Sequence, residues 1–171
     1  VQPDSAIDTN GLLADWAALQ DTHDFFALLN RHGAERQQSF RLAQGVHTQP
    51  LATSAIDALL QNAALDATPI MCFVDSPGCI QIHSGPVHRV EPRDIRGERW
   101  LNVIDPSFNL HLREDDIAQV WRVSKPTDDG TVTSVEAFDA RGELIVRFFG
   151  ARKPGQPELQ AWRDLVAQLP Q

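Results

Sequence analysis

The sequence predicts an α+β fold, with helices at both ends of the chain and an antiparallel, meandering β-sheet of about seven or more strands between them. Helical spacing of apolar residues is confined to the beginning of the chain and to its last segment. The middle of the chain instead carries short runs rich in β-branched and aromatic residues. Tight turns join these runs, which favours antiparallel pairing between neighbouring strands.

The N-terminal region is expected to begin with a loose lead-in over residues 1–10, followed by helical structure over residues 11–33. Asp21 is a suitable N-cap for the second part of this region, because its carboxylate can accept hydrogen bonds from free N–H groups of a first helical turn. Asp24 stands three positions later, in an acidic variant of the capping box. Gly33 provides the stop, since glycine readily adopts the left-handed conformation that ends a helix.

The strand region begins with two β-rich runs, Ile70–Val74 and Cys79–His83, and the Ser76-Pro77-Gly78 segment between them is typical of a hairpin turn. Further strands are predicted over residues 100–104, 108–112, 118–124, 132–138 and 144–149. Further helices are predicted over residues 34–43, 54–64 (capped by Ser54) and 157–169. No repeat or linker interrupts this order, so residues 11–171 are expected to form one domain.

Composition and charge argue against several classes of function. Hydrophobic residues make up 42% of the 171 residues and charged residues 22%, as in an ordinary globular protein. The formal net charge of −8 repels phosphate backbones, so nucleic acid is not an expected partner. No run approaches the roughly 20 apolar residues that span a bilayer, so membrane insertion is not expected either.

The two cysteines, Cys72 and Cys79, both fall in apolar, strand-like segments. We expect two buried thiols on adjacent strands, because free cysteine behaves as a small apolar residue. A disulfide is less favoured, since nothing else in the sequence indicates an oxidising compartment. The spacing of the two residues also matches no common zinc site.

The usual catalytic motifs are missing from the sequence, and no catalytic residue is predicted. The chain has no Gly-rich phosphate loop, no His-Glu-x-x-His, no Gly-x-Ser-x-Gly and no Cys-x-x-Cys. No two of its six histidines have the spacing of a metal-binding pair, so a zinc site is only weakly supported.

His23 is the histidine whose surroundings best suit a metal ligand, although a lone histidine on a helix is more often structural or exposed. It lies in the first turn of its predicted helix, where the helix dipole disfavours a protonated ring. The neutral imidazole is the form that can donate a lone pair to iron. Asp21 and Asp24 flank His23 and can orient its ring, and Phe25 and Phe26 follow as apolar neighbours.

Three basic residues form a second group of candidates. Arg36, Lys125 and Arg152 are far apart in the sequence, and each by itself is explained as an ordinary surface charge. If they converged beside a flat apolar ligand, they would provide the charge-assisted hydrogen bonds that two carboxylates require. The sequence does not show whether they converge.

Four stretches of the sequence, taken in order, carry a resemblance to a known family. They are Asp21-Thr22-His23-Asp24-Phe25-Phe26-Ala27-Leu28-Leu29 with Glu35-Arg36-Gln37-Gln38; Gly78–Ile82; Trp100–Pro106 with His111-Leu112; and a tail with Lys125-Pro126-Thr127, Gly150-Ala151-Arg152, Gly155–Glu158 and Trp162-Arg163. Together they resemble the C-terminal half of the HemS/ChuS/HmuS family of bacterial haem-utilisation proteins. The resemblance covers nearly the whole chain beyond residue 10.

The resemblance implies a cofactor and a set of site residues. The histidine of the Asp-x-His-x-Phe-Phe segment is the axial haem ligand in such proteins, and this role falls on His23. Arg36 then corresponds to a propionate contact, and Lys125 and Arg152 correspond to residues that line the same cleft. The implied ligand is haem b, iron protoporphyrin IX, and haem is therefore the expected partner.

The sequence departs from the family pattern in two ways. Some members have a tyrosine just before the glycine of the tail motif, where this chain has Phe149, and the chain contains no tyrosine at all. We therefore expect Phe149 to line a drier pocket, without a hydroxyl to bind a propionate or a water. The second departure is length, because family proteins are two tandem halves that hold haem in the cleft between them.

Two explanations of the length follow. The chain is either a piece of a two-half protein, which fits the missing initiator Met, or a natural single-half protein that pairs with itself. The expected macromolecular partners are therefore an N-terminal half of the same protein or a second copy in a homodimer, as in the related ChuX/HutX-type proteins. A haem importer or a haem oxygenase is a further partner consistent with the resemblance.

The resemblance leaves three functions open. The favoured one is haem binding and trafficking in the cytoplasm during iron acquisition. The second is enzymatic opening of the porphyrin, which releases iron. The third is a structural role, in which this half stabilises a larger protein and binds little haem alone.

Overall fold

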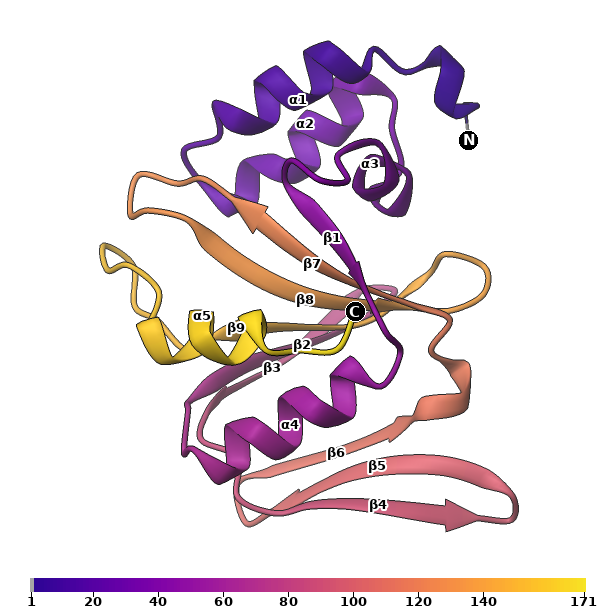
Figure 1. Ribbon diagram of the computed structural model, residues 1–171, viewed down its shortest axis with the longest axis vertical. Helices are drawn as coiled ribbons and strands as arrows, with labels where there is room; N and C mark the ends of the chain where they lie inside the picture. The colour runs from indigo at the N-terminus through magenta and orange to yellow at the C-terminus, as the bar shows by residue number, and fades with distance from the viewer. Residues whose placement is uncertain (1) are drawn as a thin grey trace.

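The computed structural model describes residues 2–171, and within them it has five α-helices and nine β-strands (Figure 1). The helices are α1 Thr9–Ala17, α2 Phe25–His32, α3 Arg36–Leu42, α4 Ala55–Leu65 and α5 Gln160–Ala167. The strands are β1 Thr48–Leu51, β2 Ile70–Ser76, β3 Cys79–Gly85, β4 Val90–Ile95, β5 Glu98–Asp105, β6 Phe108–Arg113, β7 Gln119–Lys125, β8 Val132–Phe138 and β9 Leu144–Gly150. Short 3-10 turns are η1 Asp4–Ala6, η2 Thr22–Asp24 and η3 Glu114–Asp116. The predicted α+β class is confirmed.

The strands form two antiparallel sheets where the sequence predicted one. A six-stranded sheet has the order β1-β7-β8-β9-β2-β3, and a three-stranded sheet has the order β4-β5-β6. The chain leaves the large sheet after Gly85, where Pro86 follows and lacks the N–H that a continuing ladder needs. Val87 is fully buried there and anchors the crossing to the small sheet.

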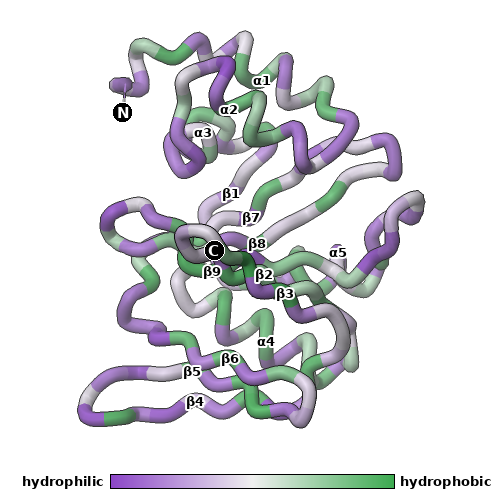
Figure 2. The backbone as a smooth tube through the Cα atoms, turned by 180° about the vertical axis from the view of Figure 1, so that it is seen from behind, coloured by the Kyte–Doolittle hydropathy of each residue, from purple (hydrophilic) through white to green (hydrophobic). Residues whose placement is uncertain are grey.

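Helices cover the two faces of the large sheet differently (Figure 1). On one face, α4, α5 and the small sheet share a core that includes Ile56, Val103 and Phe148. On the other face, α1, α2 and α3 pack over the β7–β8 end, where Trp121 and Phe138 join their core. Figure 2 shows apolar segments gathered around the large sheet and α4, whereas β4 and β5 carry mostly hydrophilic residues.

The N-terminal residues are more ordered than a loose lead-in. Residues 4–6 form η1, Ile7 is buried, and α1 begins at Thr9 because the Asp8 carboxylate accepts a hydrogen bond from the Gly11 N–H. Gly33 ends α2 as predicted, with a φ of 61°. Ser54 stands at the N-cap of α4, but its side chain makes no capping hydrogen bond.

The prediction for the two cysteines is half wrong. Cys72 is buried on β2, and burial raises the pKa of its thiol to about 12. Cys79 is exposed, because it stands at the first position of β3, beside the turn at the edge of the sheet. Both thiols are free.

Within residues 2–171, no helix is both long enough and apolar enough to cross a bilayer.

Candidate functional site

His23 is held in a defined orientation at the surface. Its backbone N–H donates to Asp21 Oδ1 at 2.8 Å, and its ring Nδ1 lies 2.6 Å from the same oxygen. These bonds with His23 hold the pKa of Asp21 below its ordinary value, so the carboxylate stays an acceptor. With Nδ1–H donating to Asp21, the lone pair of Nε2 is directed outward, and 92% of the side chain is exposed.

A cavity of about 330 Å³ lies beside His23. Its walls come from η2, from β2 and β9, and from the loops around residues 129 and 152. The lining residues are Asp21, Thr22, His23, Met71, Phe73, Asp129, Val132, Phe149, Arg152 and Pro154. The structure thus brings three predicted site residues, His23, Phe149 and Arg152, to one pocket.

The floor of this pocket is apolar and aromatic. Phe73 on β2 and Phe149 on β9 meet edge to face, with ring centroids 5.3 Å apart and an interplanar angle of 74°. Both rings are only partly buried, so they present apolar surface to the cavity. Such a floor favours a flat, hydrophobic ligand.

Arg152 supplies a cation at the edge of the pocket. Its Nη1 lies 3.2 Å from Asp129 Oδ2 and donates to the Gln156 carbonyl oxygen, also at 3.2 Å. Gly150, two residues earlier, is the glycine of the tail motif Gly150-Ala151-Arg152. Glycine is required there because a Cβ at this position would stand 2.6 Å from the side chain of Trp162 on α5. The close packing of this glycine against Trp162 fixes the path of the chain that leads to Arg152.

Arg36 and Lys125 do converge, but on a residue that the sequence did not reveal. Glu136 on β8 is completely buried, and it accepts from Arg36 Nε at 2.7 Å and Nη2 at 2.9 Å. Lys125 Nζ lies 3.6 Å from the same carboxylate. Burial alone would raise the pKa of Glu136, but the charges of Arg36 and Lys125 hold it at about 2. Neither basic residue lines the 330 Å³ cavity.

Aromatic rings complete this buried ion cluster of Arg36, Lys125 and Glu136. Lys125 Nζ stands 4.3 Å from the centroid of the Phe25 ring, and the Arg36 guanidinium stands 5.4 Å from it. Burial lowers the pKa of Lys125 to about 8, against the opposing attraction of Glu136. Because the cluster holds two cations and one anion, it leaves net positive charge near the pocket.

One row of side chains connects the ion cluster to the pocket floor. The strand register places Glu136 opposite Arg147 on β9, and Arg147 opposite Phe73 on β2. Arg147 lies over the Phe73 ring at 5.5 Å, and its Nη2 donates to both carboxylate oxygens of Asp75, at 2.9 and 2.7 Å. The ion pair of Arg147 and Asp75 therefore packs against the pocket floor at Phe73 and supports it on one side.

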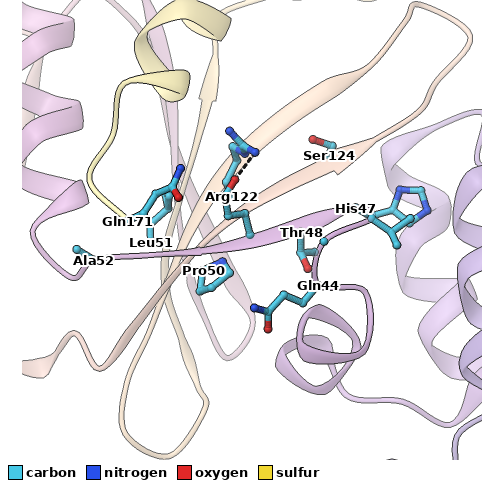
Figure 3. A pocket seen from close by; sticks show the side chains of 12 residues that line it. Gln44, His47, Thr48, Pro50, Leu51, Ala52, Arg122, Ser124 and Gln171 are labelled. Atoms are coloured by element: carbon cyan, nitrogen blue, oxygen red, sulfur yellow. Dashed lines mark hydrogen bonds between the residues drawn. The ribbon is translucent and has the colours of Figure 1, made fainter.

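A different hollow, of about 550 Å³, lies beside the edge strand β1 (Figure 3). Arg122 donates to Gln49 there, and His47 stands near one end. The His47 ring stacks on Trp16, with centroids 5.2 Å apart and planes 2° apart, and burial lowers its pKa. This histidine is engaged in packing, and no predicted site residue lines the hollow.

A sequence profile described as the haemin-degrading HemS.ChuX domain matches residues 33–169. The chain belongs to this family. Among its HemS/ChuX relatives, the hemin transport protein HemS of Yersinia enterocolitica is 41% identical over 166 residues, which are 97% of this chain and 46% of that protein. HmuS of Yersinia pestis, also named a hemin transport protein, is 40% identical over 91% of this chain.

Solved structures of family members have the same fold. Holo-PhuS, a heme-binding protein from Pseudomonas aeruginosa, superimposes with a TM-score of 0.95 at 50% identity, over 99% of this chain and 48% of that one. ChuS, a heme degrading enzyme of Escherichia coli O157:H7, gives a TM-score of 0.91 at 38% identity, over all of this chain and 49% of that one. ChuX shares the fold at 11% identity, with a TM-score of 0.71. The chain spans about half the length of the HemS, PhuS and ChuS relatives.

Three residues of this region, Glu136, Phe73 and Arg147, were not among those predicted from the sequence. Glu136 had a usable signal, because it is an acidic residue within the otherwise apolar or small run Val132–Phe138. Phe73 and Arg147 had none, since only the register of β2 against β9 shows that they are neighbours. Within residues 2–171, no group of three or more histidine, cysteine or acidic side chains is placed to hold a metal ion.

Proposed function

We propose that this chain binds haem b as a cargo and passes it on within the cytoplasm during iron acquisition, with His23 as the axial ligand. The observation that carries the proposal is the orientation of His23. Its Nδ1 is engaged with Asp21, which leaves an exposed Nε2 lone pair beside an apolar floor. A neutral imidazole oriented by a carboxylate is a good iron ligand.

The pocket residues fit one side of a porphyrin. Phe73, Phe149 and Met71 provide apolar surface for the macrocycle, and Arg152 stands where a propionate can be paired. Arg36 and Lys125 support the same propionates through the net positive charge of the ion cluster, or directly if a propionate replaces part of the Glu136 pairing.

The size and openness of the pocket also indicate that a second protein surface covers the other face of the haem. A cavity of about 330 Å³ is at the small end of ligand pockets, and the His23 side chain is open to solvent. The relatives are about twice as long as this chain. We therefore propose that an N-terminal half or a second copy covers the other haem face, and that an importer or a haem oxygenase exchanges haem with it.

Haem degradation is the second candidate function, because the chain is 38% identical to ChuS, which is described as a heme degrading enzyme. Haem, oxygen and an electron donor would supply that chemistry. The residues of this chain would bind and orient haem and, with the apolar Phe149 floor, keep water from it. No residue of the pocket is assigned a catalytic role.

The test is a haemin titration of the whole chain, in the wild type and in His23→Ala. The Soret absorption band of the bound haem is the readout. We expect the tightest-binding equivalent of haemin to disappear in His23→Ala, with a changed Soret maximum. His88→Ala is the matched control, since His88 is also exposed and its ring lines no part of this pocket. Equal affinity and equal spectra in the His23→Ala variant would overturn the ligand assignment.

A second measurement separates carrier from enzyme. The haem complex is incubated with a physiological reductase in the presence of catalase, and the Soret band is followed. A carrier keeps the band, whereas an enzyme loses it and releases iron. Loss that catalase abolishes indicates non-specific oxidation by peroxide and leaves the carrier function standing.

A further inference from the structure

The small sheet presents a polar outer face that takes no part in the His23 pocket. Leu101, Val103 and Leu112 point inward to the core shared with α4. Their neighbours along each strand point outward and include Trp100, Asn102 and His111. This face lies at the opposite end of the molecule from α1 and α2 (Figure 1). Trp100, Asn102 and His111 belong to the sequence motifs that the His23 pocket leaves unexplained.

His111 is oriented by a buried amide. Asn102 is only 4% exposed, and its Nδ2 donates to the Glu91 carbonyl oxygen at 3.2 Å. A carbonyl oxygen only accepts, so this bond turns Asn102 Oδ1 toward His111 Nδ1, 2.7 Å away. Nδ1 therefore carries the proton of the neutral ring, and Nε2 keeps its lone pair. This is the same division of roles that Asp21 imposes on His23.

His111 and Trp100 stand between two hollows. One, of about 530 Å³, is lined by Ile95, Arg96, Glu98, Trp100, Asn102 and His111. The other, of about 650 Å³, is lined by the same two residues together with residues from η3 and from the turn before β9. Trp100 is partly buried, and Ile95 is 47% exposed at the edge of the sheet. A histidine, an indole ring and an aliphatic side chain thus share one surface.

Arg96 provides a cation that is not already paired. Arg93 is bound to Glu91, and Arg113 is bound to Glu98 and Asp116. Across residues 2–171, no carboxylate lies within ion-pair distance of Arg96. Arg96 is also one of two non-glycine residues there with positive φ, at 57°. Asparagine or glycine is favoured in such a hairpin turn, so arginine costs stability, as is common where a side chain serves a ligand.

We propose that this outer face is a second haem-binding site, with His111 Nε2 as the iron ligand. Trp100 and Ile95 contact the macrocycle, and Arg96 pairs with a propionate. The choice of ligand rests on the proposed function, but the site shares no residue with the His23 pocket. Because its hollow is shallow and flanked by Glu98, it binds haem more weakly than the His23 pocket.

The experiment is a haemin titration that counts equivalents in the whole chain and in four variants. The variants are His23→Ala, His111→Ala, the double variant and the control His88→Ala. We expect two equivalents in the wild type and in the control, with the second at least about tenfold weaker. His111→Ala keeps the tight equivalent and loses the weak one, His23→Ala does the opposite, and the double variant loses both.

Two other results are decisive. A wild-type stoichiometry and affinity in His111→Ala overturns the second site and leaves the proposed function intact. A single equivalent that depends on His111, and not on His23, overturns His23 as the axial ligand of the proposed function and supports this site.

Arg96→Asn provides an independent check, because asparagine suits the turn and the fold is retained. We expect the second equivalent to weaken by about tenfold while the first is unchanged. An unchanged second equivalent removes Arg96 from the site, and with it the charge complementarity on which the proposal depends.

Discussion

Two halves of the same face of the large sheet differ in what covers them. Over β7 and β8, the side chains of Trp121, Val123 and Phe138 are sealed beneath α1, α2 and α3. Over β2 and β3, Phe73 is half-buried, and Ile80 and Ile82 are 58% and 60% exposed. The strand register places Ile82 beside Phe73 on this face.

Both halves carry apolar side chains, so the presence of apolar residues alone does not distinguish them. The sealed half is part of the core because helices exclude water from it. The open half carries apolar side chains beside the Arg147–Asp75 ion pair and has no helix above it, and His23 lines the pocket there. The pocket is therefore an uncovered continuation of the core, and such a surface suits the flat apolar ligand that we propose.

The largest effect should come from breaking the ion cluster at the boundary. In Glu136→Gln, the amide group faces the buried Lys125 and the partly buried Arg36 without a negative charge, and both cations lose their partner. We expect the free energy of unfolding to fall by about 3–5 kcal/mol. Urea denaturation measures it, and a loss below about 1 kcal/mol would contradict the structural role of the cluster.

Glu136 should also make the stability of the protein depend on pH in the acid range. The folded-state pKa of Glu136, about 2, lies below its ordinary value of 4.5. Its contribution to stability is therefore complete above pH 4.5 and is lost as the pH falls from 4.5 toward 2. Glu136→Gln should lack this part of the acid transition, which denaturation at a series of pH values can show. Identical pH profiles for the two proteins would assign the transition to other carboxyl groups.

The substitution Phe40→Tyr in the sealed half should lower the free energy of unfolding by less than Glu136→Gln does. Phe40 is completely buried, and rings of Trp16, Phe25, Trp121 and Phe138 surround it at 5.8–6.3 Å. In Phe40→Tyr, the added hydroxyl has little room among these apolar rings. We expect a loss of about 2 kcal/mol from overpacking and an unmet hydrogen bond. Thermal unfolding measures the loss, and an unchanged midpoint would mean that this half is not sealed.

The matching substitution in the open half, Phe149→Tyr, should leave stability within about 0.5 kcal/mol of the wild type. Phe149 borders the cavity, so the new hydroxyl can reach solvent or ligand. We expect haem affinity to rise by about three- to tenfold, because a hydroxyl can donate to a propionate. Soret titration gives the affinity. Destabilisation equal to that of Phe40→Tyr would erase the distinction between the halves.

The smallest effect concerns the two thiols of one hairpin, Cys72 buried within β2 and Cys79 exposed beside the turn at the start of β3. Cys79 should react quickly with a maleimide, whereas Cys72 should stay protected, since burial raises its thiol pKa to about 12. Mass spectrometry should show one added label in the native protein and two after denaturation. Two rapid additions in the native state would place β2 outside the core.

Local sequence patterns predicted the elements well where one signal dominated. The hairpin at Pro77-Gly78, the stop at Gly33 and the strand Val132–Phe138 are confirmed. The strands β1 and β4 were missed because Pro50 and Pro92 interrupt their β pattern. Both lie at the edge of a sheet, where a missing N–H is tolerated.

The sequence by itself determined all but two of the strands, the positions of the helices, the family resemblance and the candidacy of His23, because capping, turn chemistry and motif order are local properties. Only the tertiary structure decided which strands are neighbours, and so which charges meet. It drew Arg36 and Lys125 to Glu136, and it left Arg152 beside His23. The physical reason is that pairing order in a sheet, and the energy of a buried charge, depend on residues about a hundred positions apart in the chain.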